Sequence, residues 1–410
     1  MRGRPYLYTS YSSEMSLFPT TTKRVAMGLL LLVAVLLPLR ALPGLGYLGD
    51  SDWMLLIDRA LIFAIGALGL NLLTGVAGQV SLGHAFFMAV GAYAAVLLGG
   101  EPGSTIWGLG LPIWIWLPAA GLMAAFIGII VAPTAVRVRG LYLAFVTLGL
   151  VFIGQYLWRN LGKIAGGPTT GRDWPPLEFA FWRDQEAFLD FAKDGAWFNI
   201  QLIGEAKTYY FLLGLVILMA LLAKNLMRTR VGRAWASIRD RDIAAEIMGV
   251  NEAKGKTRAF AISSFYAGVA GALLGAVFGR LIPESWDLLL SVEFIAIILI
   301  GGAGTISGTL LGTVFVVMTP RVVQDFTLWL TEQAEGGGAF SGVADLVVAT
   351  GTGDFGVISS GAAGPGLSIF QLNVVLFGVL IVVFLIAEPL GLYGIWVRIR
   401  NYWKGWPFSY

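Results

Sequence analysis

The chain has 410 residues, of which 57% are hydrophobic and only 13% are charged. Soluble domains carry about one quarter charged residues, so this composition excludes a water-soluble globular protein. The sequence has no cysteine and a single histidine, His84, which excludes disulfides, metal thiolates, thiol nucleophiles and histidine pairs. The net charge of +3 is small and does not indicate a nucleic-acid partner.

Long apolar runs follow one another along most of the chain. Each is long enough to cross about 30 Å of hydrocarbon as a helix, which predicts an all-α, polytopic integral membrane protein. The first run, Val25 to Leu42, could be a signal peptide, but its length and the lack of a clear small-x-small cleavage site favour an uncleaved helix. Further spans are expected at Met54–Leu73, Ala77–Leu98, Leu111–Pro133, Leu141–Trp158, Thr208–Leu226, Ala259–Phe278 and Ile369–Ala387.

The run from Glu293 to Thr319 is too long for one ordinary span, and Gly301-Gly302-Ala303-Gly304 interrupts it. Basic residues of membrane proteins are concentrated in cytoplasmic loops. Their positions therefore predict how many times this run crosses the membrane. Only two crossings put every basic group on the cytoplasmic side, namely Lys23 and Arg24, Arg137 and Arg139, Arg228 to Arg258, and Arg398, Arg400 and Lys404. The sequence thus predicts about ten transmembrane helices, some of them broken, with both termini cytoplasmic.

The predicted organisation is a single membrane domain with short polar ends. Residues 1–24 form a polar cytoplasmic segment, residues 25–397 the transmembrane domain and residues 398–410 a cytoplasmic tail. External excursions are expected at about 159–207 and 321–368. Neither excursion is large enough to predict a separate enzyme domain.

Two glycine-rich segments, each after an apolar helix, are similar to each other. Gly75-Val76-Ala77-Gly78-Gln79-Val80-Ser81 is echoed by Gly301-Gly302-Ala303-Gly304-Thr305-Ile306-Ser307. Transporters are often built from repeats with broken helices near the substrate path. Glycine-rich turns can also be similar by chance, and the sequence does not determine the symmetry of such a repeat.

The segment from Arg228 to Arg258 carries eight basic and four acidic residues and is too polar to enter the bilayer. Good helix formers run from Ala234 to Met248, with Trp235, Ile238, Ala245 and Met248 near helical spacing, and Gly249 can form a left-handed cap. This pattern predicts a short helix of about residues 233–251 across the membrane face. It could anchor the protein at lipid headgroups, but the small residues Ala236, Ala244, Ala245 and Gly249 favour docking into a groove of another protein.

Three blocks of sequence carry a resemblance to a known family. The first runs from Gly232-Arg233-Ala234 through Arg239-Asp240, Ala244-Ala245 and Met248-Gly249-Val250-Asn251 to Lys256, with Ala267–Leu273 after it. The second comprises Asn71–Gly75, Ala77–His84 and Gly91-Ala92-Tyr93, and the third comprises Ser291 and Gly301–Gly308, with Gly166–Gly171 as an external turn. Together they resemble the LivM-type permease subunits of ATP-binding cassette importers for branched-chain amino acids.

The resemblance covers most of Asp58 to Pro320 and the tail near Pro389–Leu392. The chain departs from the family in its longer polar N-terminus, in an insertion from Val322 to Leu367, and in Glu388, where a basic residue is expected before Pro389. These departures leave the substrate and the external contacts open. They do not affect the family resemblance.

The resemblance implies that the polar helix sits in a cleft of a cytoplasmic ATPase and transmits its closure to the membrane helices. The coupling residues would be Arg233, Ala236, Arg239, Asp240, Ala244, Gly249, Val250 and Asn251. It also implies two ATP-binding cassette ATPases, a homologous second permease and an external solute-binding protein as partners in the plasma (inner) membrane of a prokaryote. The solute would be a branched-chain or other hydrophobic amino acid, or a small amide or urea.

One motif in the polar segment is similar to a phosphate-binding loop. Residues Gly249 to Thr257 end in Gly-Lys-Thr, but the spacing is one residue too long and no β-strand precedes it. ATP hydrolysis is therefore expected only from separate subunits. We expect no cofactor and no metal in this chain.

Polar residues inside the predicted spans are candidates for the translocation path. They are Asn71, Gln79, Ser81, His84, Tyr93, Thr147, Gln155 and Glu293. Each could instead form a hydrogen bond between helices, and Asp58 and Arg59 are interpreted as structural residues near the external headgroups. The alternative function is a self-sufficient secondary transporter or channel, for which only Glu293 is a plausible ion-coupling carboxylate. A membrane enzyme is disfavoured because no span holds a nucleophile with a base.

Overall fold

The computed structural model describes residues 21–39, 49–101, 107–138, 140–166, 171–175, 177–179, 189–191, 195–197, 200–202, 204–336, 348–349, 358–359, 367–388 and 390–405. Several predicted features lie outside these residues. They are residues 1–20 of the N-terminal segment, residues 40–42 of the first span, Arg139, part of the Gly166–Gly171 turn, parts of the two excursions, Pro389 and residues 406–410.

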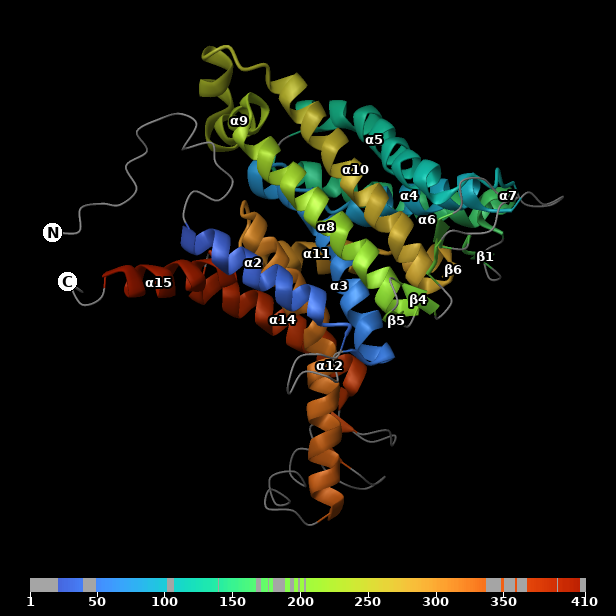
Figure 1. Ribbon diagram of the computed structural model, residues 1–410. Helices are drawn as coiled ribbons and strands as arrows, with labels where there is room; N and C mark the ends of the chain where they lie inside the picture. The colour runs from blue at the N-terminus through green and yellow to red at the C-terminus, as the bar shows by residue number, and fades with distance from the viewer. Residues whose placement is uncertain are drawn as a thin grey trace.

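Helices dominate the described part of the chain (Figure 1). They are α2 (Thr21–Leu36), α3 (Ser51–Leu70) with the π-helix η2 (Asn71–Val76), α4 (His84–Gly99), α5 (Ile113–Arg137), α6 (Leu141–Asn160), α7 (Gly162–Ala165), α8 (Gly204–Arg228), α9 (Arg230–Ile247), α10 (Glu252–Phe278), the 3-10 helix η3 (Pro283–Ser285), α11 (Leu288–Gly301), α12 (Ile306–Gly336), α14 (Ile369–Ala387) and α15 (Gly391–Gly405). This is the all-α class expected from the sequence.

The strands are short. The antiparallel pairs are β1 (Arg172–Asp173) with β6 (Arg280–Leu281), β2 (Glu178–Phe179) with β3 (Leu189–Asp190), and β4 (Gly195–Trp197) with β5 (Ile200–Leu202). A parallel sheet joins β7 (Val348–Ala349), β8 (Ile358–Ser359) and β9 (Leu367–Ser368). None of them lies inside a predicted span.

Six helical segments in the described residues are long and apolar enough to cross a membrane. They are Ser51–Val76, Ile113–Arg137, Tyr142–Asn160, Gly204–Arg228, Glu252–Phe278 and Ile306–Phe326. The other predicted spans are helices too, but α4 has 16 residues and α11 only 14. At 1.5 Å per residue, α11 is about 21 Å long, less than the hydrocarbon thickness. The count of about ten crossings and the side of the termini therefore stay predictions.

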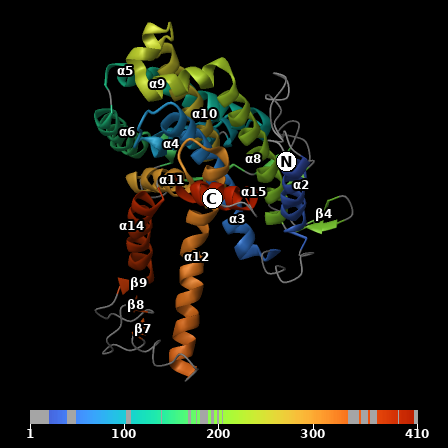
Figure 2. The same cartoon turned by 90° about the vertical axis from the view of Figure 1, so that its left-hand side faces the viewer.

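Several helices begin earlier than expected, such as α10 at Glu252, and two further differences change the predicted layout. The span expected from Ala77 begins only at His84, because Gly78 adopts a φ of +70° and residues 77–83 form a turn. The excursion expected from Arg321 begins as a continuation of α12, which runs without a break to Gly336. Figures 1 and 2 both show α12 projecting beyond the other helices.

Small residues bring the central helices close together. Helix α10 packs against α3, α4 and α5, and a Cβ added to Gly91 on α4 would overlap the backbone of Gly268 on α10. A Cβ on Gly271 would likewise overlap the Met88 carbonyl. Lipid gives helices no hydrophobic reason to associate, so close van der Waals packing of this kind holds a membrane bundle together.

Helix α10 runs from the end of the molecule that carries α9 to the end that carries β6 (Figure 1). At the β6 end, Arg172 is buried and its Nη1 donates to the carbonyl oxygens of Trp107 at 2.6 Å and Ile164 at 3.2 Å. Burial lowers the pKa of the Arg172 guanidinium, but arginine starts from so high a value that it keeps its charge. The buried arginine therefore connects β1 with α7 and with the segment before α5.

Candidate functional site

The polar helix α9 lies between the two spans α8 and α10 and is fastened to α10 by its buried face. The Nε1 of Trp235 donates to the carbonyl oxygen of Gly255 at 2.9 Å, and Trp235 and Ile238 are both buried. Gly249 follows the helix with a φ of +85°, the left-handed conformation expected of it. The side chain of Asn251 then accepts a hydrogen bond from the Lys254 nitrogen at 2.9 Å and starts α10.

A kink divides α9 into two parts. Arg241 has non-helical angles, φ −156° and ψ 96°, and the Asp242 carboxylate accepts from the Ile243 nitrogen at 2.8 Å to start the second part. Beyond the kink, Ile243, Ile247 and Met248 are 63%, 80% and 83% exposed. Met248, which helical spacing groups with the buried Trp235, is thus turned outward.

The predicted coupling residues occupy the outer side of α9 and the turn after it. Arg233, Ala236, Arg239, Asp240, Ala244, Gly249 and Asn251 are exposed, and Val250 is partly buried. Ala245, expected to assist docking as a small residue, is buried instead. Their contact with an ATPase stays a prediction.

Arg239 belongs to this set, yet its guanidinium is turned toward the membrane helices. Its Nη1 donates to the carbonyl oxygen of Gly75 in η2. Its aliphatic part lies against Gly78, where an added Cβ would come within 2.9 Å of the Arg239 Cγ. The bond gives α9 a direct attachment to the turn between α3 and α4.

The two glycine-rich segments that echo each other in the sequence meet at this place. The Gly304 nitrogen donates to Oδ1 of Asn71 at 2.7 Å, and Nδ2 of Asn71 donates to the Thr305 carbonyl oxygen at 3.2 Å. A Cβ added to Gly75 would overlap both the Asn71 side chain and the Gly304 backbone. We call Asn71, Gly75, Gly304 and Thr305 the turn junction.

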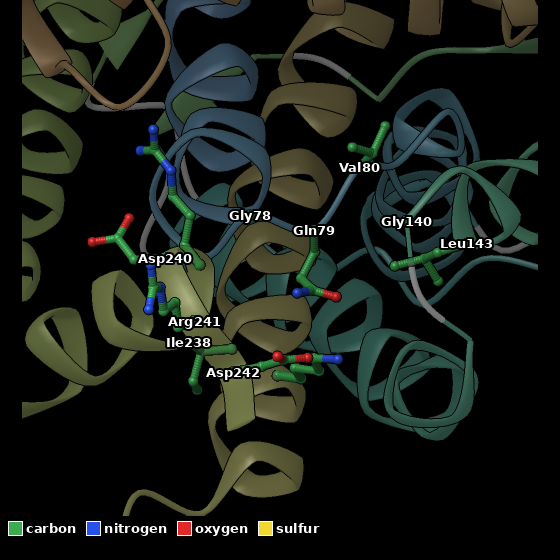
Figure 3. Close-up of a pocket in the computed structure, with 11 residues that line it drawn as sticks. Gly78, Gln79, Val80, Gly140, Leu143, Ile238, Asp240, Arg241 and Asp242 are labelled. Carbon is green, nitrogen blue, oxygen red and sulfur yellow. The ribbon is translucent and has the colours of Figure 1, made fainter. Parts of the chain in front are cut away.

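A polar crevice lies beside the turn junction, between α9 and the membrane helices (Figure 3). Its volume is about 210 Å³, and it is lined by Gly78, Gln79, Val80, Gly140, Leu143, Ile238, Arg239, Asp240, Arg241, Asp242 and Lys256. Lys256 is buried here, with Nζ at 2.7 Å from a Glu252 oxygen and 3.2 Å from the Ala135 carbonyl oxygen. The crevice therefore lies between α9 and the bundle, and charges of both signs line it.

Four of the predicted path residues surround the glycine turns. Asn71 belongs to the turn junction, and Nε2 of Gln79 donates to the Ala77 carbonyl oxygen at 3.2 Å. Ser81 Oγ accepts from the Gly83 nitrogen at 3.3 Å, and Thr147 Oγ1 accepts from the Leu82 nitrogen at 2.9 Å. The structure brings these residues together around the turns, where their side chains hydrogen-bond to the backbone. Their predicted role in lining the translocation path stays a prediction.

Of the other four, His84 directly follows the first turn, and the rest lie on α4, α6 and α11. His84 starts α4 and is buried, its ring 4.8 Å from that of Phe294, and its Nε2 has no hydrogen-bond partner among the described residues. Tyr93 stacks on Trp158 at 4.2 Å, and Gln155 and Glu293 are partly buried on α6 and α11. Asp58, interpreted as a structural residue, is buried as well.

Sequence reasoning did not single out Thr305 as a contact residue or Lys256 as a buried one. Thr305 lies in the second glycine-rich segment, and Lys256 lies at the end of the first family block. Both residues were therefore part of sequence patterns that had been identified. Only their contacts with Asn71 and Glu252 distinguish them from neighbouring residues. Such contacts depend on the tertiary structure.

Comparison with known proteins shows the family of this chain. The family model described as "Branched-chain amino acid transport system / permease component" matches residues 54–385. The chain is 34% identical to the high-affinity branched-chain amino acid transport system permease protein LivM of Escherichia coli and 33% identical to that of Salmonella typhimurium. Each match covers 72% of this chain and 69% of the relative. No solved structure matches the chain.

The apolar spans and this relationship agree with the predicted location, a multi-pass protein of the inner membrane. The match runs from the start of α3 nearly to the end of α14 and so includes α9 and both glycine-rich turns. The chain belongs to the family of branched-chain amino acid transport permease components.

Proposed function

We propose that this chain is the transmembrane permease subunit of an ATP-binding cassette importer, with α9 as the helix that docks on the ATPase. The observation that carries the proposal is α9 itself. It is an 18-residue polar helix between two spans, exposed on one side and hydrogen-bonded through Arg239 to a turn of the bundle on the other. A helix placed in this way can exchange movement between a soluble partner and the membrane helices.

The exposed part of α9 has the chemistry of a docking surface. Ile243, Ala244, Ile247 and Met248 form an apolar stripe on the second part of the helix, and Asp240 lies next to it before the kink. An amphipathic helix commonly binds by laying an apolar stripe of this kind in a groove of its partner. The partner we propose is one of two cytoplasmic ATPases, which would supply the nucleotide hydrolysis that this chain is not expected to perform.

The sidedness follows from charge. The basic residues of α9, of the end of α5 and of α15 would face the cytoplasm under the positive-inside rule. In this orientation residues 1–24 and 398–410 are cytoplasmic, residues 25–397 form the membrane domain, and the segments around 159–207 and 321–368 are external. An external solute-binding protein and a homologous second permease would complete the importer.

The proposed solute is a branched-chain or related amino acid, and small amides or urea are the nearest other candidates. The two relatives are named as permease proteins of high-affinity branched-chain amino acid transport systems. The identities of 34% and 33% leave room for a different solute in this chain.

The experiment is purification of the tagged chain from its native membrane in mild detergent, with mass spectrometry of the proteins that come along. We expect an ATPase and a second permease in the purified complex. A matched pair of variants locates the contact. Ile247→Asp on α9 should reduce the recovered ATPase about tenfold, whereas Leu109→Asp at the other end of the molecule should not.

A stable monomer or homo-oligomer without any ATPase would instead support a self-sufficient secondary transporter. Equal recovery of ATPase with Ile247→Asp and with the wild type would place the contact away from α9.

A further inference from the structure

Three chain segments that are far apart in the sequence meet at the turn junction. They are the first part of α9, the π-helix η2 after α3, and the turn between α11 and α12. Each hydrogen bond described among them has a backbone group as one partner. Such a meeting point can transmit movement, because hydrogen bonds to backbone move whole turns and not single side chains.

The carbonyl oxygen of Gly75 is free to accept from Arg239 for a local reason. The chain leaves its helical path after Val76, and the last carbonyl groups of a helix have no donor within that helix. A π-helix at this point also widens the turn, a feature often found at functional sites. The Arg239 guanidinium supplies the missing donor from outside the bundle.

Asn71 joins this turn to the second one. Both polar atoms of the Asn71 side-chain amide form hydrogen bonds. The oxygen accepts from the Gly304 nitrogen, and the nitrogen donates to the Thr305 carbonyl oxygen. The absence of a side chain at Gly75 and Gly304 lets the two backbones touch. A displacement of η2 therefore displaces the start of α12 with it.

Arg239 stands where a movement of α9 would pass into the bundle. It is two residues before the kink at Arg241, and the apolar docking stripe lies directly after that kink. Trp235 holds the beginning of α9 on α10, so the helix can swing at its kinked end while its start stays in place. The crevice next to Arg239 leaves space for such a swing.

We propose that Arg239 and Asn71 form a relay that transmits movement of α9 to both glycine turns at once, and so to both halves of the internal echo. This inference rests on the proposed function, since it explains how ATPase closure would reach the membrane helices. Both are positioning residues: Arg239 connects α9 to η2, and Asn71 connects η2 to the turn before α12.

The test uses the complete complex in proteoliposomes, with uptake of radiolabelled L-leucine and release of phosphate measured together. Arg239→Gln should lower the leucine taken up per ATP hydrolysed about tenfold, the effect of losing one hydrogen bond from a charged donor. Arg239→Lys, which keeps a donor on a shorter side chain, should recover part of the coupling. Asn71→Leu, similar in shape but without the amide, should uncouple as strongly as Arg239→Gln.

Arg230→Gln is the matched control, because it removes a positive charge from the exposed start of α9 and does not reach the turns. It should leave the uptake per ATP unchanged. The amount of bound ATPase should be equal in all four variants and the wild type.

Two results would overturn the relay. One is an uptake per ATP in Arg239→Gln equal to that in Arg230→Gln. The other is a failure of both Arg239→Gln and Asn71→Leu to assemble, which would make these residues anchors of the fold only. Failure of the proposed function looks different, because the wild-type chain would then recover no ATPase or its complex would take up no leucine.

Discussion

Side chains of Thr147, Asn71 and Arg239 each complete a backbone hydrogen bond that a glycine turn leaves open. In a membrane domain an unpaired backbone group costs several kcal/mol, since there is no water to replace the partner. The chain can therefore break its helices near residues 77–83 and 302–305 only with such partners at hand. Polar residues inside spans are thus explained in part by the turns that they support.

We predict that Thr147→Val destabilises the protein. The hydroxyl group of Thr147 accepts from the Leu82 nitrogen, and valine keeps the shape but leaves that nitrogen without its acceptor. The expected loss is about 1–3 kcal/mol, measured as a lower melting temperature in detergent. Thr134→Val is the control, because the Thr134 hydroxyl only donates within its own helix, to Val131. Equal melting temperatures for the two variants would contradict the assigned role.

A second prediction concerns Asp240, which is exposed next to the apolar stripe of α9. Asp240→Lys reverses a charge on the proposed docking surface, and like charges across an interface disfavour docking. We expect uptake to fall about tenfold or more while ATP hydrolysis persists and the amount of protein in the membrane stays normal. Asp173→Lys reverses an exposed charge at the opposite end and should not affect uptake. Normal uptake in Asp240→Lys would count against docking through α9.

At the scale of elements, the molecule combines a tightly packed centre with a polar surface helix. The helices α4 and α10 touch through glycines, whereas α9 lies at the surface, attached by its buried face and by the hydrogen bonds of Trp235 and Arg239. Cores that are closely packed transmit displacement because they cannot deform continuously. An exposed α9 on a closely packed bundle agrees with its proposed role as a coupling helix.

The packing of α4 on α10 gives a prediction for the elements themselves. Gly91→Ala places a methyl group against the Gly268 backbone, so the helices must separate and the melting temperature should fall. A shift equivalent to about 1–3 kcal/mol is expected for such overpacking. Gly214→Ala on α8 is the control, since nothing lies within 4 Å of its added Cβ. A melting temperature unchanged by Gly91→Ala would show that α4 and α10 do not pack this closely.

At the scale of the whole molecule, the two opposite ends of the folded protein differ in the elements that they contain. The end with α9 also holds the end of α5, the start of α6 and both glycine turns, as the lining of the crevice and the turn junction show. The other end holds β1, β6, α7 and η3, with the ion pair of Arg159 and Glu284 at 3.0 Å. Helix α10 runs from one of these ends to the other (Figure 1).

The absence of cysteine from the sequence allows a direct test of this sidedness. We predict that a membrane-impermeant maleimide labels Asp173→Cys in intact spheroplasts and labels Glu246→Cys only after permeabilisation. Both residues are exposed, so access decides the result. Labelling of Glu246→Cys in intact spheroplasts would reverse the proposed orientation.

The sequence by itself determined the class of protein and much of its layout. Hydrophobic length alone predicts most helices, because a membrane span needs a continuous apolar run. The polar run around α9 and the left-handed Gly249 after it were also visible, since both depend on local composition and backbone freedom. The three sequence blocks were sufficient to identify the family, and the comparisons confirmed it.

Only the tertiary structure decided where the broken helices meet and which way Arg239 points. Asn71 and Thr305 are 234 positions apart, and no local pattern encodes a contact over such a distance. The start of α4 at His84 and the extension of α12 to Gly336 were likewise hidden, because apolar length does not show where a helix begins or ends. Arg239 is an exposed basic residue of α9 in the sequence pattern, and its bond to Gly75 exists because the fold leaves that carbonyl group without another partner.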